Sequence, residues 1–92
     1  MEIEIKGDTE KFKRILPSIN YMVKDVIKEY NLSDITRIVL TESIYDIIIV
    51  IFTKNHLNTY LIDKVRNSLI SNLYNYLNVY PMVIINKDPE LD

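Results

Sequence analysis

The chain has 92 residues, of which 48% are hydrophobic and 26% charged, and its net charge is −2. This is the length of one domain, and the slight acidic excess does not suit a nucleic-acid-binding protein, which usually carries a basic stripe. There is no cysteine and only one histidine, His56, so disulfides, thiol nucleophiles and a site of several histidines within one chain are excluded.

The first six residues, MEIEIK, alternate between apolar and charged side chains, which predicts a half-buried strand. Gly7 ends this strand, and Asp8 or Thr9 can cap the helix that follows. From residue 12 to residue 30 the apolar positions recur at helical spacing and stay in phase across Pro17. We therefore expect one helix here, either kinked at the proline or preceded by a short turn.

Two stretches rich in β-branched residues come next, ITRIVLT (35–41) and IYDIIIVIFT (44–53), separated only by Glu42 and Ser43. This arrangement predicts a hairpin. A two-residue turn would place Val39 opposite Asp46.

The last third of the chain predicts a second helix, capped by Asn55 and ended by Asn78, and a final strand over 79–85. Tyr60 and Tyr76 widen the apolar stripe of this helix, and we expect them in the core. Pro81 cannot donate a hydrogen bond to a neighbouring strand, so the final strand should lie at a sheet edge or a bulge.

The element order is thus β-α-β-β-α-β. Two right-handed crossovers joined by a hairpin give an α+β, two-layer α/β sandwich of the ferredoxin-like type. We expect a four-stranded antiparallel sheet of order 4-1-3-2 with both helices on one face. The domain should span residues 1–86, with a polar tail over 87–92.

Alternation sorts the hairpin side chains onto two faces. One face is wholly apolar and should meet the helices. The other carries an apolar patch within charged surroundings, and nothing else in the chain is left to cover it, so we expect a contact surface there. The expected interface residues are Val39, Ile48, Val50 and Phe52 as the apolar anchor, with Arg37, Asp46 and Glu4 setting the register. Within it we expect an ion pair between Asp46 and Arg37.

Asp46 also permits a second interpretation. A hairpin whose second strand opens with an acid and runs DIIIVIF, followed by a helix and the strand VYPMVIINKDPEL, resembles the minimal nucleotidyltransferase-like fold over residues 35–91. In that family a Gly-Ser turn precedes an Asp-x-Asp pair that holds two metal ions. This chain has Glu42-Ser43 and Ile48 at those places, so the resemblance implies at best an inactive relative, because one carboxylate cannot hold two metals.

Gly7 gives a third possibility, since ligand-binding regulatory domains such as ACT modules often keep a glycine after the first strand. The simpler interpretation is a tight turn. His56 has no recognisable nucleophile or acid tied to it, so we expect an exposed residue and not a catalytic base. The favoured interpretation is a non-enzymatic cytoplasmic interaction module without cofactors, which binds itself as a homodimer or binds another protein. We expect neither a membrane nor a nucleic acid as partner.

Overall fold

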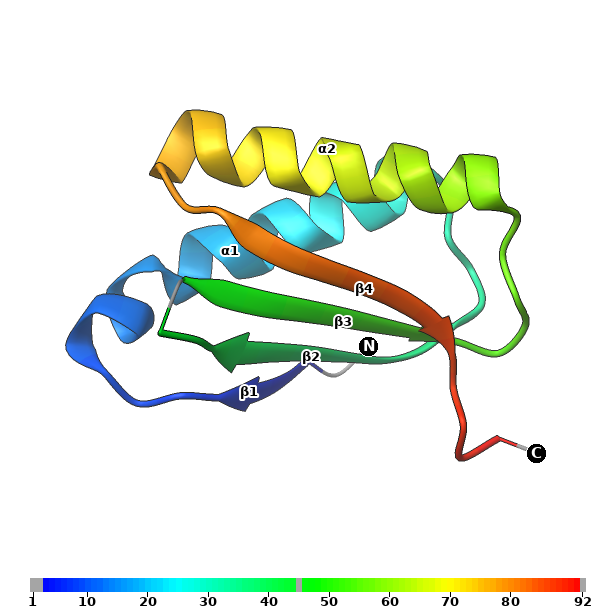
Figure 1. The fold of residues 1–92 in the computed structure, drawn as a ribbon, viewed down its shortest axis with the longest axis horizontal. Helices are drawn as coiled ribbons and strands as arrows, with labels where there is room; N and C mark the ends of the chain where they lie inside the picture. The colour runs from blue at the N-terminus through cyan, green and yellow to red at the C-terminus, as the bar shows by residue number, and fades with distance from the viewer. Residues whose placement is uncertain (1–2, 45, 92) are drawn as a thin grey trace.

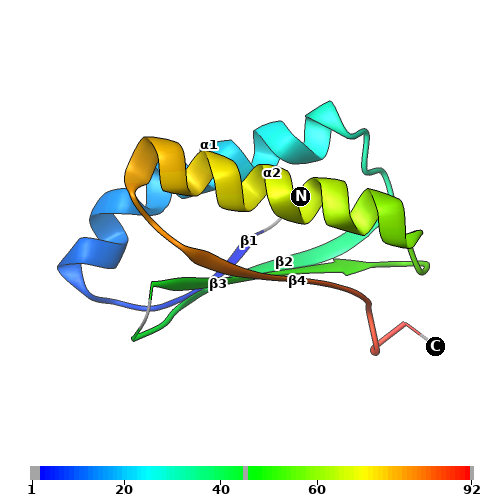
Figure 2. The same ribbon diagram turned by 45° about the horizontal axis from the view of Figure 1, so that its top comes forward.

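The computed structural model describes residues 3–44 and 46–91. The predicted order of strands and helices is confirmed: β1 (Ile3–Lys6), α1 (Glu10–Glu29), β2 (Ile35–Glu42), β3 (Ile47–Thr53), α2 (Thr59–Leu77) and β4 (Pro81–Lys87). The strands form one sheet, and both helices pack on the same face of it (Figures 1 and 2). Neither of the described helices has the length and apolar character needed to cross a bilayer.

The strand order corrects the ferredoxin-like prediction. The sheet runs β1-β2-β3-β4, with β1/β2 and β3/β4 parallel and β2/β3 antiparallel, so it is mixed and does not have the antiparallel order 4-1-3-2. β1 lies at an edge and not between β3 and β4. Composition explains this, because β1 is four residues long with three of them exposed, whereas β3 and β4 are mostly apolar and bury more surface as neighbours.

The new order also changes the handedness of the crossovers. Both crossovers step in the same direction across the sheet, but their strands run in opposite directions. Two helices can then share one face only if the crossovers have opposite hands. The left-handed one is β1-α1-β2 (Figures 1 and 2), against the right-handed rule that most β-α-β units follow.

The core lies between the helices and one face of the sheet. Ile47, Ile49 and Ile51 of β3 are at most 1% exposed, which confirms the predicted core face of the hairpin. The helices meet this face with Phe12, Ile19, Val23, Val26, Ile27, Val65, Leu69 and Leu73. Tyr60 and Tyr76 do not join them, since they are 72% and 75% exposed, so their assignment to the core was wrong.

The helix ends follow local capping chemistry. The Thr9 hydroxyl accepts a hydrogen bond from the Phe12 N–H, as predicted, and α1 continues through Pro17 as one helix. α2 is capped by Asn58 and not by Asn55, because the Asn58 side chain accepts from the Leu61 N–H at 2.8 Å. Asn78 ends α2 in the left-handed conformation.

The hairpin pairs in a different register from the one predicted. Val39 lies opposite Val50, and Glu42 lies opposite Ile47, so the connection spans 43–46 instead of two residues. The displacement of four residues is an even number. It therefore leaves each side chain on its predicted face while changing its cross-strand neighbours. Tyr45, predicted on the core face, lies outside the described residues.

Candidate functional site: the open face of the sheet

The face of the sheet turned away from the helices, called the open face below, is a grid of three rows. Partners on neighbouring strands share a face, so the register fixes each row. The row nearest the hairpin turn holds Lys6, Thr41, Ile48 and Met82. The middle row holds Glu4, Val39, Val50 and Ile84, and the third row holds Arg37, Phe52 and Asn86.

Six apolar side chains adjoin one another on this grid, and we call them the apolar block: Val39, Ile48, Val50, Phe52, Met82 and Ile84. Met82 is 59% exposed, Val39 is buried at 7%, and the other four are half-buried. At the usual spacing of strands and of alternate residues along a strand, the six positions cover about 190 Å². Contiguous apolar side chains bordered by charged residues are a common feature of contact surfaces.

The structure thus brings together all four predicted anchor residues and adds two. Met82 and Ile84 were missed because the expected order placed the charged strand β1 between β3 and β4. In the observed order β4 pairs directly with β3, with Met82 beside Ile48 and Ile84 beside Val50. The sequence signal that could have identified Met82 and Ile84 is their alternation with Val83 and Ile85, which are buried.

Charged side chains border the apolar block on two sides. On β1, Glu4 and Lys6 are exposed. At the far end, the Arg37 guanidinium lies 4.3 Å from the centre of the Phe52 ring, a cation–π contact. The same guanidinium makes ion pairs with Glu4, Asp88 and Glu90 at 3.8–3.9 Å. Its Nε is buried without a hydrogen-bond partner.

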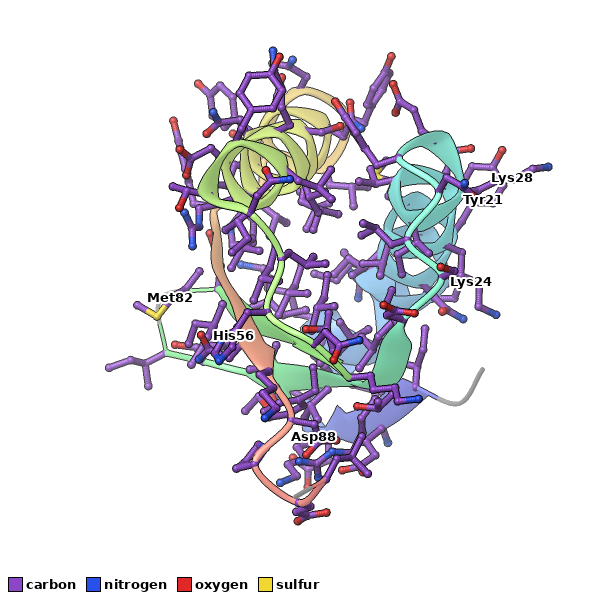
Figure 3. All side chains as sticks on the ribbon, turned by 90° about the vertical axis from the view of Figure 1, so that its right-hand side faces the viewer. Tyr21, Lys24, Lys28, His56, Met82 and Asp88 are labelled. Carbon is purple, nitrogen blue, oxygen red and sulfur yellow. The ribbon has the colours of Figure 1, made fainter. Side chains whose placement is uncertain are left out.

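Asp88 anchors the segment after β4, which the sequence suggested only as a polar tail. Its carboxylate accepts hydrogen bonds from the Thr36 hydroxyl at 2.7 Å and from the Glu90 N–H at 3.0 Å. Its own N–H donates to the Thr53 carbonyl at 2.7 Å. The Thr36 bond first, then the Glu90 bond and the charge of Arg37, hold the pKa of Asp88 below its ordinary value. Figure 3, which looks along the strands, shows Asp88 on the side of the sheet turned away from the helices.

Asp46 does not pair with Arg37 as predicted. It precedes β3, and its carboxylate accepts a hydrogen bond from the Tyr80 N–H at 2.8 Å, which ties the hairpin turn to the start of β4. The longer hairpin is the cause, since it places Phe52 opposite Arg37 and moves Asp46 to the other end of the sheet. Asp46 therefore lies at the rim of the open face and apart from the charged cluster around Arg37.

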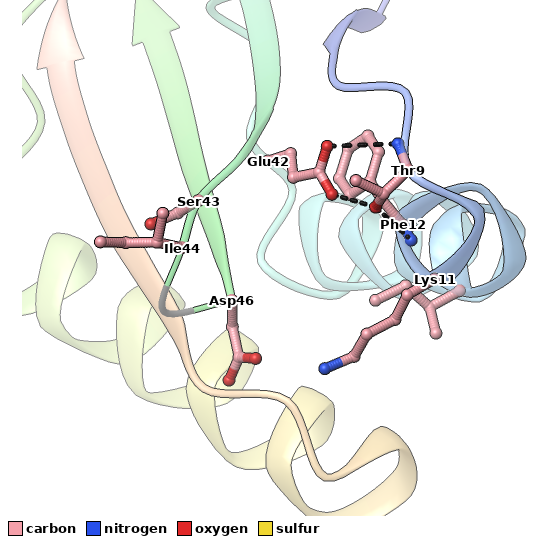
Figure 4. A pocket seen from close by; sticks show the side chains of 8 residues that line it. Thr9, Lys11, Phe12, Glu42, Ser43, Ile44 and Asp46 are labelled. Atoms are coloured by element: carbon pink, nitrogen blue, oxygen red, sulfur yellow. Dashed lines mark hydrogen bonds between the residues drawn. The ribbon is translucent and has the colours of Figure 1, made fainter.

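Two hollows flank the hairpin turn, and Ser43 and Asp46 border both. One, of about 350 Å³, lies beside the start of α1 (Figure 4). The other, of about 340 Å³, is continuous with the apolar block and is lined by Ser43, Asp46, Ile47, Ile48, Tyr80, Pro81 and Met82. The second hollow deepens the open face at the β3–β4 corner.

Beside this first hollow, the N-terminus of α1 is already bound by a carboxylate of the same chain. The Glu42 carboxylate accepts hydrogen bonds from the Asp8 and Thr9 N–H groups, at 3.2 and 3.4 Å, and from the Thr9 hydroxyl. The hydroxyl bond is the main reason why the pKa of Glu42 lies below its ordinary value. The positive end of the α1 dipole is therefore already neutralised by an internal anion.

Gly7 is explained by packing. A Cβ at this position would lie 2.5 Å from Glu42 Cβ and 2.8 Å from the Phe12 ring, so a larger residue would push β2 and α1 apart. Its place in the fold thus follows from the close approach of β2 and α1, a reason that the predicted tight turn did not include.

His56 is exposed in the connection before α2. Across residues 3–44 and 46–91 there is no group of three His, Cys, Asp or Glu residues placed to hold a metal ion. No family of known proteins matches the chain, and no curated protein sequence is detectably similar to it. The open face must therefore be interpreted from its own geometry.

Proposed function

We propose that the protein is a small, non-enzymatic, cytoplasmic interaction module that forms a homodimer through the open face of its sheet. One observation carries the proposal: the apolar block lies on the face that neither helix covers. Full burial of a large apolar side chain stabilises a protein by about 1.5–3 kcal/mol. The half-buried and exposed members of the block still have apolar surface in water, so part of this free energy has not yet been gained. A second sheet packed on this face would remove that surface from water.

The edges of the sheet are poor alternatives for association. β1 is short and presents Glu4 and Lys6. β4 begins at Pro81, and the Arg66 side chain donates a hydrogen bond from Nε to the Val83 carbonyl at 3.2 Å. Short length, charge, proline and covered carbonyls are the usual means by which proteins protect sheet edges from pairing. Association through the face is therefore favoured over association through an edge.

The charges around the apolar block favour a second copy of the chain over a strongly charged partner. Both signs are present on the rim, with Lys6 and Arg37 against Glu4, Asp88 and Glu90. A rim of mixed sign can complement itself in a symmetric pair, whereas a rim of one sign would repel its own copy.

The test is the mass of the protein in solution. The block of about 190 Å² is much smaller than the roughly 800 Å² per partner of a standard interface, so the dimer should dissociate on dilution. Light scattering over a concentration series should approach twice 10.9 kDa at the high end. Ile48→Lys should remain folded at the monomer mass, because a lysine at the centre of the first row cannot be buried unpaired.

Tyr60→Lys is the matched control, since Tyr60 is an exposed aromatic residue on α2, outside the open face. This variant should dimerise like the parent chain. A folded Ile48→Lys variant that still dimerises, or a parent chain that stays monomeric at millimolar concentration, would contradict the proposed function.

A further inference from the structure

We propose that the two-fold axis of this dimer runs along β3, so that the two β3 strands face each other and β1 remains outside the interface. The inference rests on the proposed homodimer and specifies its geometry. It follows from how apolar and charged residues are divided among the four strands of the open face.

The β3 column of the open face is entirely apolar, with Ile48, Val50 and Phe52. On either side, β2 contributes two uncharged residues and Arg37, and β4 contributes two apolar residues and Asn86. Among the described residues, the β1 column holds Glu4 and Lys6. Apolar character is thus centred on β3 and not on the middle of the sheet, which lies between β2 and β3.

An axis along β3 matches these columns. Rotation about it places each copy's β2 on the partner's β4 and keeps the rows aligned. Val39 then meets Ile84, Thr41 meets Met82, and each β3 residue meets its own copy across the axis. Face-to-face sheets pack about 10 Å apart with strand directions within about 30°, so the axis is inclined to β3 only slightly.

Axes that bring β1 into the interface bury its charged side chains. An axis between β2 and β3 would place β1 on the partner's β4, with Glu4 against Ile84 and Lys6 against Met82. An axis across the strands through the middle row would place Glu4 on its own copy. Unpaired charges against apolar surface and like charges in contact are both unfavourable, so these two arrangements are rejected.

Cysteine cross-linking tests the axis, because the chain has no cysteine of its own. Under mild oxidation Val50→Cys should form a disulfide-linked dimer by itself, since this residue lies on the axis. Disulfides between packed sheets are known in immunoglobulin domains. Val39→Cys alone and Ile84→Cys alone should not link, but a 1:1 mixture of the two should, as a heterodimer.

Two features make the pattern specific. Each variant chain carries a single cysteine, so any disulfide must join two chains. Glu4→Cys mixed with Ile84→Cys is the matched control and should not link. If that mixture links, or if Val50→Cys fails to link in a protein that light scattering shows to be dimeric, the axis is wrong. If every sample is monomeric and unlinked, the homodimer itself is wrong.

Discussion

Arg37 is the residue that joins the sheet, the segment after β4 and the open face. It stacks on Phe52 within the sheet and faces carboxylates from β1 and from residues 88–90. The sequence indicated a role for Arg37 in setting the register but assigned it the wrong partner, Asp46. That choice depended on the length of the hairpin turn, which the residues Glu42 and Ser43 did not determine.

Asp88 should make the stability of the protein sensitive to acid. Its pKa is lowered in the folded state, chiefly by the Thr36 hydroxyl, so its contribution is complete above the ordinary value of about 4 and is lost as the pH falls through the lower folded value. Asp88→Asn should lower the thermal midpoint at pH 7 by a few degrees. It should also lose less stability than the parent chain between pH 5 and pH 2.

Thermal unfolding followed by circular dichroism at several pH values measures both effects. Asp25→Asn, at an exposed position on α1, is the control and should follow the parent chain. A residual acid dependence should remain in Asp88→Asn, because the pKa of Glu42 is also lowered. Parallel pH curves for the parent chain and Asp88→Asn would contradict the role given to Asp88.

At the scale of the elements, helices were predicted more accurately than strand partners. Helical periodicity and caps such as Thr9 and Asn78 are local properties, and both were recovered. The start of α2 was misplaced because Asn55 and Asn58 offer the same capping chemistry three residues apart. Strand pairing involves residues far apart in sequence, and no local pattern states which strand lies next to which.

The two helix caps should differ in strength. Asn58→Ala removes one hydrogen bond to a helix N–H and should cost about 1 kcal/mol in the free energy of unfolding. Thr9→Ala should cost more, about 2 kcal/mol, because the Thr9 hydroxyl accepts from the Phe12 N–H and also donates to Glu42. Urea denaturation measures both values.

Thr9→Ser keeps the hydroxyl group and should restore most of the stability. Equal losses for Thr9→Ala and Asn58→Ala, or a Thr9→Ser variant as unstable as Thr9→Ala, would show that the bond to Glu42 adds nothing to the cap.

For the whole molecule, the assignment of faces was predictable and the strand order was not. Side-chain alternation placed Val39, Ile48, Val50 and Phe52 on the open face, and this survived a change of register because the displacement was even. The order 4-1-3-2 rested on the preference for right-handed crossovers. Here that preference yields to the composition of β1, which is too short and too charged for the middle of a sheet.

The strand order can be tested with a disulfide within the chain. Lys6 and Thr41 are partners on β1 and β2, so the double variant Lys6→Cys/Thr41→Cys should form an internal disulfide in dilute solution. Lys6→Cys/Met82→Cys is the control, because β1 and β4 lie at opposite edges. Thiol counting after oxidation, with the mass checked for monomer, measures the outcome. The opposite pattern would restore the order 4-1-3-2.

The protected borders of the sheet set an upper size for the proposed assembly. β1 is short and charged, and β4 carries Pro81 and the Arg66 contact to its backbone. In a dimer stacked face to face both apolar blocks are buried, and the edge strands β1 and β4 do not favour pairing with a further strand. Such a complex is closed under its own symmetry, so crowding the solution should populate pairs without seeding fibrils.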